Sequence, residues 1–369
     1  MSWSTVRADQ FCTLITDGTH DSPKPQQSGW KLITSKHLKG HYIDFDSANW
    51  ISEADYLKVI SRSAVEQWDI LFSMIGTIGN IYLEKNSHVE YACKNMGIFK
   101  FSGNKENALW MYYYLKSPQA KAYIQTHLRG STQAYVPLGG LREMPVPVPP
   151  QSVRNEIIAV LRPIDEKIEC NNAINDNLQQ QAQAIYSSMF IDNPDPAWSH
   201  GHLSDLITVK YGKDHKKLAD GIYPVYGSGG IMRYVERPLY NKESVLIPRK
   251  GTLNNVMYVN QPFWSVDTMF YTEMKLPNVA KFVYHFVKAK DLASMNAGSA
   301  VPSMTTDILN AMEVVIPSAS ALEEFESLVA PMYEAMEAND VQSKALSQMR
   351  DTLLPKLMSG EIDVSDIQL

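Results

Sequence analysis

Apolar residues recur at intervals of three and four in two long stretches of the chain, from about Ser152 to Phe190 and from about Ser320 to Met358. This periodicity predicts two amphipathic helices that pack antiparallel against each other, as in a coiled coil. The positions that we expect on the packing and docking faces of these helices are Ile168, Ile174, Leu178, Ile185, Leu346, Met349, Leu353 and Leu357.

A proline interrupts each stretch, Pro163 in the first and Pro331 in the second. Proline has no amide hydrogen to donate within a helix, so we expect a break or a new helix start at both positions. Each stretch would then contain a short helix followed by a longer one. The long helix from about Ile164 to Phe190 would measure ~40 Å at roughly 1.5 Å per residue.

The two stretches are copies of one pattern. Matching residues keep a constant register over about 60 positions, which is hard to obtain by chance. The matched pairs are Gly130 and Gly298, Leu141 and Leu309, Met144 and Met312, Pro163 and Pro331, and Leu178 and Leu346. The chain is therefore predicted to consist of two similar halves.

The segments ahead of the helical stretches have the pattern of two mixed lobes. In the first lobe we expect strands at Trp30–Thr34, Tyr42–Phe45 and Asp69–Ile75, and helices at Ser52–Val59 and Ala108–Gln125. In the second lobe we expect strands at Ile222–Tyr226, Ser244–Pro248, Asn255–Val259 and Met269–Met274, and a helix at Val279–Ala289.

The predicted fold class is therefore α+β, with pseudo-two-fold symmetry. Two similar mixed α/β domains, residues 1–150 and 197–318, would alternate with a central helical repeat, 151–196, and a C-terminal helical repeat, 319–369.

Composition narrows the class of protein. At 369 residues the chain can form two or more domains, and its 44% hydrophobic and 20% charged residues are ordinary for a soluble globular protein. It shows no basic, apolar N-terminal signal and no run of about 18 apolar residues, so we expect no membrane association. Cys12, Cys93 and Cys170 lack metal-ligand spacing and are interpreted as reduced thiols of a cytoplasmic protein.

The net charge of −6 argues against a simple nucleic-acid binder, but the charge is unevenly distributed. Residues 1–150 carry +2 and residues 200–318 carry +3, whereas residues 151–199 carry −4 and residues 319–369 carry −7. Of 37 aromatic residues, 32 lie in the two mildly basic segments. We therefore expect any polyanion to meet the lobes rather than the helices.

Strong signatures of catalysis are absent from the sequence. Gly212-Lys213 is followed by an aspartate, so it is not a nucleotide-binding phosphate loop. The glycine-rich segment Gly227–Gly230 lies between expected strands and favours a hairpin turn over a cofactor loop. Asp267 with Glu273 and Lys275 resembles the carboxylates and lysine of a metal nuclease, although ordinary strand-face charges explain one such match better. The sequence therefore favours a recognition protein.

Several segments resemble the specificity (S) subunit of type I restriction-modification enzymes. The alternation of lobes with helical repeats and the ending Asp351-Thr352-Leu353-Leu354-Pro355-Lys356-Leu357-Met358-Ser359-Gly360-Glu361-Ile362 are the most specific similarities. Shorter similarities are Asp17-Gly18-Thr19-His20, Gly76-Thr77-Ile78-Gly79, Asp165-Glu166-Lys167-Ile168-Glu169, Tyr226-Gly227-Ser228-Gly229-Gly230-Ile231 and Arg249-Lys250-Gly251-Thr252. The resemblance covers essentially the whole chain.

The resemblance implies a division of labour. Each lobe would be a target-recognition domain that reads one half of a split, asymmetric double-stranded DNA sequence. The paired helices would set the spacer between the halves and dock two methyltransferase (M) subunits, which bind S-adenosylmethionine and methylate adenine. Restriction (R) subunits, which act with ATP and Mg²⁺, are further candidate partners. The chain itself would hold no cofactor or metal and would catalyse no reaction.

Candidates for DNA contact are polar residues on or beside glycine turns, where a backbone can approach the duplex. Arg249 and Lys250 stand out, because two cations beside a glycine turn suit phosphate or guanine. The full set is Thr19, His20, Lys36, Ser73, Thr77, Arg129, Ser131, Gln133, Lys213, Tyr226, Ser228, Arg249, Lys250, Asn254 and Ser299. Two alternatives stay open: a self-contained nuclease or methyltransferase, and a coiled-coil scaffold without a role in DNA binding.

Overall fold

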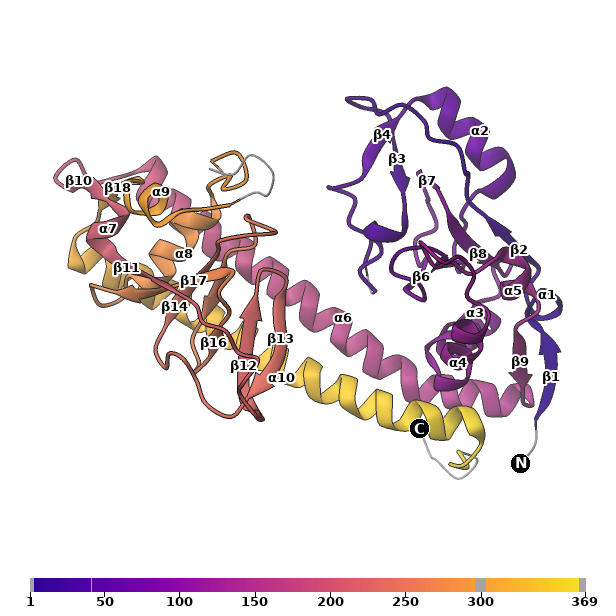
Figure 1. The fold of residues 1–369 in the computed structure, drawn as a ribbon. Coiled ribbons are helices and arrows are strands. Elements are labelled where there is room, and N and C mark those ends of the chain that lie inside the picture. The colour runs from indigo at the N-terminus through magenta and orange to yellow at the C-terminus, as the bar shows by residue number, and fades with distance from the viewer. Residues whose placement is uncertain (1–2, 41, 296–302, 365–369) are drawn as a thin grey trace. The chain divides into compact units, whose positions relative to one another are not determined.

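The computed structural model describes residues 3–40, 42–295 and 303–364 (Figure 1). Contacts divide the chain into two compact units. Unit 1 contains Met1–Asn171 and Val341–Leu369, and unit 2 contains Asn172–Asp340. Each unit combines one lobe with one part of each long helix. The first lobe is called lobe 1 and the second lobe 2.

Lobe 1 contains a four-stranded antiparallel sheet of order β2-β8-β5-β6 and a three-stranded sheet of order β4-β3-β7, in which β3 and β7 are parallel. A separate antiparallel pair joins β1 to β9. The central β5 is buried along its whole length, as its continuous apolar sequence requires. The strands are β1 (Ser4–Arg7), β2 (Leu14–Asp17), β3 (Trp30–Ile33), β4 (Asn49–Ile51), β5 (Ile70–Ser73), β6 (Ile81–Leu83), β7 (Tyr91–Cys93), β8 (Met96–Lys100) and β9 (Pro145–Val148).

The helices of lobe 1 confirm one predicted start and correct one predicted length. Ser52 caps α2, because its hydroxyl accepts the N–H of Asp55 at 3.1 Å. The single helix predicted at Ala108–Gln125 is wrong: Ser117 ends α3 and caps α4, which begins at Pro118. The helices are α1 (Ala8–Phe11), the 3₁₀ helix η1 (Ser35–His37), α2 (Glu53–Ser63), α3 (Lys105–Lys116), α4 (Pro118–Thr126) and α5 (Leu138–Arg142).

The strand predicted at Tyr42–Phe45 is also wrong. This segment makes only a bridge between Leu38 and Ile43 and otherwise forms turns. Its alternating apolar residues pack locally instead, with Ile43 buried and Phe45 against the ring of Tyr91.

Lobe 2 repeats the topology of lobe 1. Its sheets have the orders β11-β17-β14-β15 and β13-β12-β16, and β10 pairs with β18 as β1 does with β9. The strands are β10 (Ser199–His202), β11 (Ile207–Tyr211), β12 (Asp220–Gly227), β13 (Gly230–Val235), β14 (Ser244–Pro248), β15 (Met257–Val259), β16 (Trp264–Ser265), β17 (Met269–Met274) and β18 (Glu313–Ile316). The helices are α7 (Leu203–Leu206), α8 (Ala280–Lys288) and α9 (Thr306–Asn310). No helix corresponding to α2 lies in the described segment between β13 and β14.

The two long helices run straight through the prolines that were predicted to break them. Helix α6 (Gln151–Ser187) contains Pro163 and continues into a π-helical turn, η2 (Ser188–Asp192), and α10 (Ala319–Ser359) contains Pro331. An internal proline costs about 3 kcal/mol. Each fully buried aliphatic side chain contributes about 1.5–3 kcal/mol. Before Pro163, three such residues, Ile157, Ile158 and Leu161, are at most 6% exposed, so their burial outweighs the cost of the break.

In unit 1 the two helices pack antiparallel through a polar contact layer. Asp165 accepts a hydrogen bond from Arg350 at 2.7 Å, and one helical turn and a half further along α6, Asn171 donates to Gln342 at 2.9 Å. Asn171 is fully buried. The predicted apolar stripe is therefore interrupted here by buried polar side chains that hydrogen-bond from one helix to the other.

In unit 2 the contacts have the same antiparallel sense. Asn175 donates to Asp340 at 2.8 Å, and further along α6 the ring of Tyr186 meets that of Phe325 at a centroid distance of 6.2 Å. Both rings belong to the core that joins lobe 2 to the helices. The contacts between the two helices in unit 2 are thus apolar near Tyr186 and polar near Asn175.

Candidate nucleic-acid interface

In lobe 1 the loop after β2 lies directly against the end of β7. A Cβ on Gly18 would come within 2.3 Å of the carbonyl oxygen of Cys93, so only glycine fits there. The N–H of Thr19 donates to that same carbonyl at 2.9 Å, and the N–H of Gly18 donates to the carbonyl of Met96 at 2.9 Å. This close approach places the candidates Thr19 and His20 beside the connection between β7 and β8.

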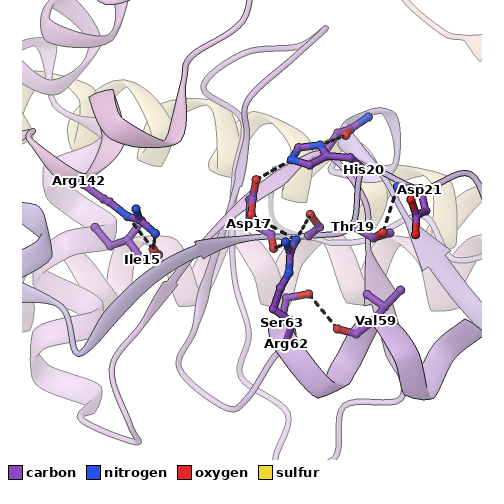
Figure 2. Close-up of polar contacts among 11 residues, drawn as sticks. Ile15, Asp17, Thr19, His20, Asp21, Val59, Arg62, Ser63 and Arg142 are labelled. Atoms are coloured by element: carbon purple, nitrogen blue, oxygen red, sulfur yellow. Dashed lines mark hydrogen bonds and ion pairs between the residues drawn. The ribbon is translucent and has the colours of Figure 1, made fainter.

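His20 is exposed but held in place. Its ring nitrogens lie 2.8 Å from Asp17 Oδ2 and 2.8 Å from Asn95 Oδ1 (Figure 2). The imidazole is therefore oriented by two neighbouring oxygens and presents its face to solvent.

Helix α2 braces the same loop. Figure 2 shows Arg62 reaching from α2 to the backbone of the loop, where it donates to the carbonyl oxygens of Gly18 at 3.0 Å and Asp17 at 3.2 Å. Lys58, one turn earlier, donates to Asp21 at 2.9 Å. That hydrogen bond and charge hold the pKa of the Asp21 carboxyl below its ordinary value. The loop is thus fixed from two sides.

The glycine turn between β5 and β6 confirms its prediction. Gly76 and Gly79 have φ values of 77° and 89°, in the left-handed region that favours glycine. The hydroxyl of Thr77 donates to the carbonyl of Ser35 at 3.3 Å. The turn therefore lies next to η1, which carries the exposed candidate Lys36.

The polar loop at residues 129–135 closes onto this turn. The N–H of Val136 donates to the carbonyl of Met74 at 2.9 Å, and Arg129 and Tyr135 exchange two backbone hydrogen bonds of 2.9 Å. The candidates in this loop are all exposed: Arg129, Ser131 and Gln133.

Lobe 2 repeats this construction with different side chains. A Cβ on Gly212 would lie 2.0 Å from the carbonyl oxygen of Val266, so glycine is again required. The N–H of Gly212 donates to Met269 at 3.0 Å, and the N–H of Lys213 donates to Ser265 at 2.8 Å. Lys213 therefore occupies the position that Thr19 occupies in lobe 1.

Arg249 occupies the position of Met74. The N–H of Met304 donates to the carbonyl of Arg249 at 2.9 Å, just as that of Val136 donates to Met74. The Arg249 guanidinium lies 5.3 Å from the ring centroid of Tyr211, a cation–π contact.

The backbone beside Arg249 is fixed as well. The N–H groups of Arg249 and Lys250 both donate to the carbonyl of Thr268, at 2.9 and 3.2 Å. Arg249 Nη1 donates to the carbonyl of Asp267 at 3.3 Å. The side chain of Lys250 is exposed, whereas that of Arg249 is half-buried and directed by its neighbours.

The hairpin tip between β12 and β13 adjoins the same turn. Asn255 donates from its side-chain amide to the carbonyl of Ser228 at 2.8 Å. Gly251, at φ 87°, lies so close that a Cβ on it would be 2.7 Å from the Ser228 hydroxyl. The structure thus brings together Ser228, Arg249 and Lys250 on one turn cluster.

Two candidates are buried. Ser73 is 0% exposed and its hydroxyl donates to the carbonyl of Ile75 at 3.2 Å. Tyr226 is 9% exposed, burial raises the pKa of its phenol, and its oxygen accepts a hydrogen bond from Gln261. Neither side chain is available to a duplex in this conformation, so we do not retain them as base contacts.

Asn254 has a structural role. Its side-chain amide donates to Asp291 at 3.0 Å and its side-chain oxygen accepts the N–H of Ala293 at 2.9 Å. Both polar ends are therefore engaged within the lobe. Ser299, the last candidate, lies outside the described residues.

Three residues of these two faces were not among the candidates: Tyr211, Asn95 and Arg62. Tyr211 directly precedes Gly212 as Asp17 precedes Gly18, so an alignment of the two glycines would have found it. Arg62 has no such signal, because only the packing of α2 brings it to the loop.

The nuclease-like residues do not form a site. Glu273 faces Lys210 at 3.6 Å, whereas Lys275 donates to the carbonyl of Ser204 at 2.6 Å. Over the described parts of the chain, no three His, Cys, Asp or Glu side chains are grouped to hold a metal ion. Among those same residues, no helix has the length and apolar character that crossing a membrane requires.

Comparison with known proteins was informative for the whole chain. Residues 3–180 and 197–325 match a family model described as the type I restriction modification DNA specificity domain. The chain is 24% identical to the type I restriction enzyme MjaIX specificity subunit of Methanocaldococcus jannaschii, over 91% of this chain and 87% of that protein. It is 20% identical to the HindI specificity subunit of Haemophilus influenzae, over 85% and 90% of the two chains.

A solved structure has a similar fold. The type I restriction-modification S subunit from M. genitalium superposes with a TM-score of 0.58 at 17% identity, covering 97% of this chain and 96% of that one. At this identity the similarity concerns the fold alone, which has two lobes of mixed α/β content joined by long helices.

Proposed function

Because this chain belongs to the type I restriction modification DNA specificity family, we propose that it is the sequence-specific DNA-binding subunit of a type I restriction-modification complex. Each lobe reads one half of a bipartite, asymmetric site. The two lobes repeat one topology, and the paired helices would set the spacer between the half-sites.

One observation carries this proposal: the two lobes build the same turn cluster from different side chains. Gly18 and Gly212 make the same close backbone approach, and Met74 and Arg249 accept the same hydrogen bond from the segment that follows. A common backbone presenting different side chains is what reading two different half-sites with one fold requires.

The chemistry of the exposed residues suits a duplex. Lysine and arginine side chains neutralise phosphates and hydrogen-bond to guanine, and hydroxyl and amide side chains bond to base edges. The candidates that remain accessible are Thr19, His20, Lys36, Thr77, Arg129, Ser131, Gln133, Lys213, Ser228, Arg249 and Lys250.

In this proposal the chain is not catalytic. Two methyltransferase subunits would supply S-adenosylmethionine chemistry, and restriction subunits, where present, would supply ATP- and Mg²⁺-dependent cleavage. The helices would dock the methyltransferase subunits. Of the predicted docking positions, Ile174 and Met349 are 40% and 53% exposed and suit a partner surface, whereas Leu357 is 1% exposed and stabilises unit 1 itself.

The test is methylation mapping in cells that express this chain with its methyltransferase partner. We expect adenine methylation at one bipartite, asymmetric motif, and none when either protein is expressed alone. Purified complex should bind that motif with an affinity that falls steeply as salt is raised. Equal affinity for unrelated duplexes, or methylation by this chain alone, would contradict the proposal.

A further inference from the structure

Aliphatic side chains are exposed at the tip of the β12–β13 hairpin in lobe 2. Ile231 and Met232, directly after the turn at Gly227–Gly230, are 49% and 60% exposed. A single exposed apolar residue needs no explanation. Two successive exposed apolar residues, beside a turn that adjoins the one carrying Arg249 and Lys250, do need an explanation.

The side chain of Met232 lies against Gly227, whose cross-strand partner is Gly230. A Cβ on Gly227 would lie 2.5 Å from the Met232 sulfur, so the absence of a side chain at Gly227 is what lets the thioether lie across the strand pair. The methionine is therefore supported from below while its outer surface stays in solvent.

The hairpin tip is continuous with the turn that carries Arg249 and Lys250. Ser228, within the tip, accepts a hydrogen bond from Asn255 and lies against Gly251. A duplex in contact with these two cations would therefore lie close to Met232. This charge complementarity makes DNA the occupant of the apolar tip.

The chemistry of the base edges indicates which base Met232 would contact. In the major groove guanine, adenine and cytosine present hydrogen-bond donors and acceptors, and only thymine presents an apolar group, its 5-methyl. A thioether with an aliphatic neighbour donates no hydrogen bond and matches that methyl. We propose that Met232 contacts the methyl group of a thymine in the half-site read by lobe 2. This inference rests on the function proposed above.

The experiment uses the complex of this chain with its methyltransferase partner and duplexes that carry the motif found by methylation mapping. Each thymine of the motif is replaced in turn by uracil, which lacks only the methyl group. For one thymine we expect methylation at subsaturating DNA to fall about threefold to tenfold, because the complex then buries one methyl group fewer. Met232→Ala should cause a similar loss on the thymine duplex and no further loss on the uracil duplex, whereas Met232→Leu should keep the discrimination.

A matched control lies on the same hairpin. Ile222, at the start of β12 and 77% exposed, is remote from the turn in sequence, and Ile222→Ala should discriminate thymine from uracil as the unaltered chain does. Methylation that is insensitive to uracil at every thymine, or full discrimination retained by Met232→Ala, would overturn the inference. Either result with intact motif-specific methylation leaves the proposed function standing, whereas loss of all sequence preference in the unaltered complex would remove the proposed function itself.

Discussion

The two lobes attach to the long helices at matched positions but with opposite chemistry. Asp165 on α6 and Tyr333 on α10 are separated by the same interval as Met144 and Met312. In unit 1, Asp165 is 8% exposed and binds Lys116 at 3.1 Å and Arg350 at 2.7 Å. Unit 1 is therefore joined by a buried ionic cluster.

In unit 2 the matched position carries a neutral group, Tyr333, and a buried ion pair, Lys281 with Glu326 at 2.6 Å, lies beside it. Tyr333 donates to Nε2 of His285 at 3.0 Å, and Nδ1 of the same ring donates to Gln183 at 2.8 Å. His285 is 0% exposed and stacks on Tyr186. The uncharged imidazole, which burial favours, satisfies both hydrogen bonds by accepting at Nε2 and donating at Nδ1. The same position thus carries a charged group in unit 1 and a neutral one in unit 2, and the two should respond differently to mutation and to pH.

A second difference lies in the turns. The backbone position that carries the buried Met74 in lobe 1 carries Arg249 in lobe 2. The loop braced by α2 in lobe 1 has no such helix among the described residues of lobe 2. Differences of this kind at a constant backbone concentrate specificity in a few side chains.

The largest effect should follow from removing the charge of Asp165. Asp165→Asn removes the carboxylate that pairs with Lys116 and leaves Arg350 with Asp351 alone, and breaking a buried pair of this kind costs about 3–5 kcal/mol. Urea unfolding should show this loss, and hydrogen exchange should place it in α3 and in the helix segments of unit 1. The matched change in unit 2, Tyr333→Phe, removes one neutral hydrogen bond and should cost only about 1 kcal/mol. Equal effects of the two substitutions would contradict the contrast between the junctions.

Acid should loosen unit 2 before unit 1. Burial lowers the pKa of His285 to about 4, below its ordinary value of 6.5. Between about pH 6.5 and about pH 4 the unfolded chain therefore binds a proton at His285 that the folded chain does not bind. The free energy of unfolding falls over this range by about 3 kcal/mol in total. Below that range both states are protonated and this loss stops growing.

The junction of unit 1 should lose stability in a different, lower pH range. Burial by itself would raise the pKa of Asp165, but the charge of Lys116 and the hydrogen bond and charge of Arg350 outweigh burial and keep that pKa below its ordinary value. Its stabilisation is present above about pH 4 and is lost only below it. Between pH 7 and pH 4.5, hydrogen exchange should therefore show deprotection around His285 and none around Asp165, and His285→Gln should reduce the difference. Earlier deprotection of unit 1 would disprove this order.

Much of this architecture could be predicted from the sequence. The constant interval between the helical stretches predicted two similar lobes, and glycine placement predicted the turns at Gly76 and Gly251, because positive φ and close backbone approach leave few alternatives to glycine. These features depend on local geometry, which a sequence specifies directly.

Other features depend on tertiary packing and were not predictable. The helices continue through Pro163 because buried neighbours offset its cost, and burial is decided by the rest of the fold. Ser73 and Tyr226 looked like surface residues of turns but lie inside the sheets. The fully buried Asn171 was missed for the same reason, since its partners come from the other helix.

We expect Arg249 to read a base and Lys250 to attract the DNA backbone in the half-site of lobe 2. Arg249→Ala should weaken binding by about 1–3 kcal/mol and relax the motif at one position of one half-site, because a directed guanidinium suits a base edge. Lys250→Ala should weaken binding to all duplexes alike and reduce the salt slope by about one. Fluorescence anisotropy at several salt concentrations, with a panel of single-base variants of the motif, distinguishes the two. Relaxation of both half-sites by Arg249→Ala would show that the lobes do not read independently.

The smallest effect should come from Tyr211, which directs Arg249 without needing to touch DNA. A cation–π contact at an exposed site contributes about 0.5–1 kcal/mol, so Tyr211→Ala should lower affinity for the motif about twofold to fivefold. Tyr211→Phe keeps the ring face and should bind as the unaltered chain does. The effect of Tyr211→Ala should vanish in an Arg249→Ala background, because the ring then has no guanidinium to hold. If instead the two losses add, or Tyr211→Phe weakens binding as much as Tyr211→Ala, the tyrosine hydroxyl itself contacts the duplex and lobe 2 reads DNA with one more residue than Arg249 and its neighbours.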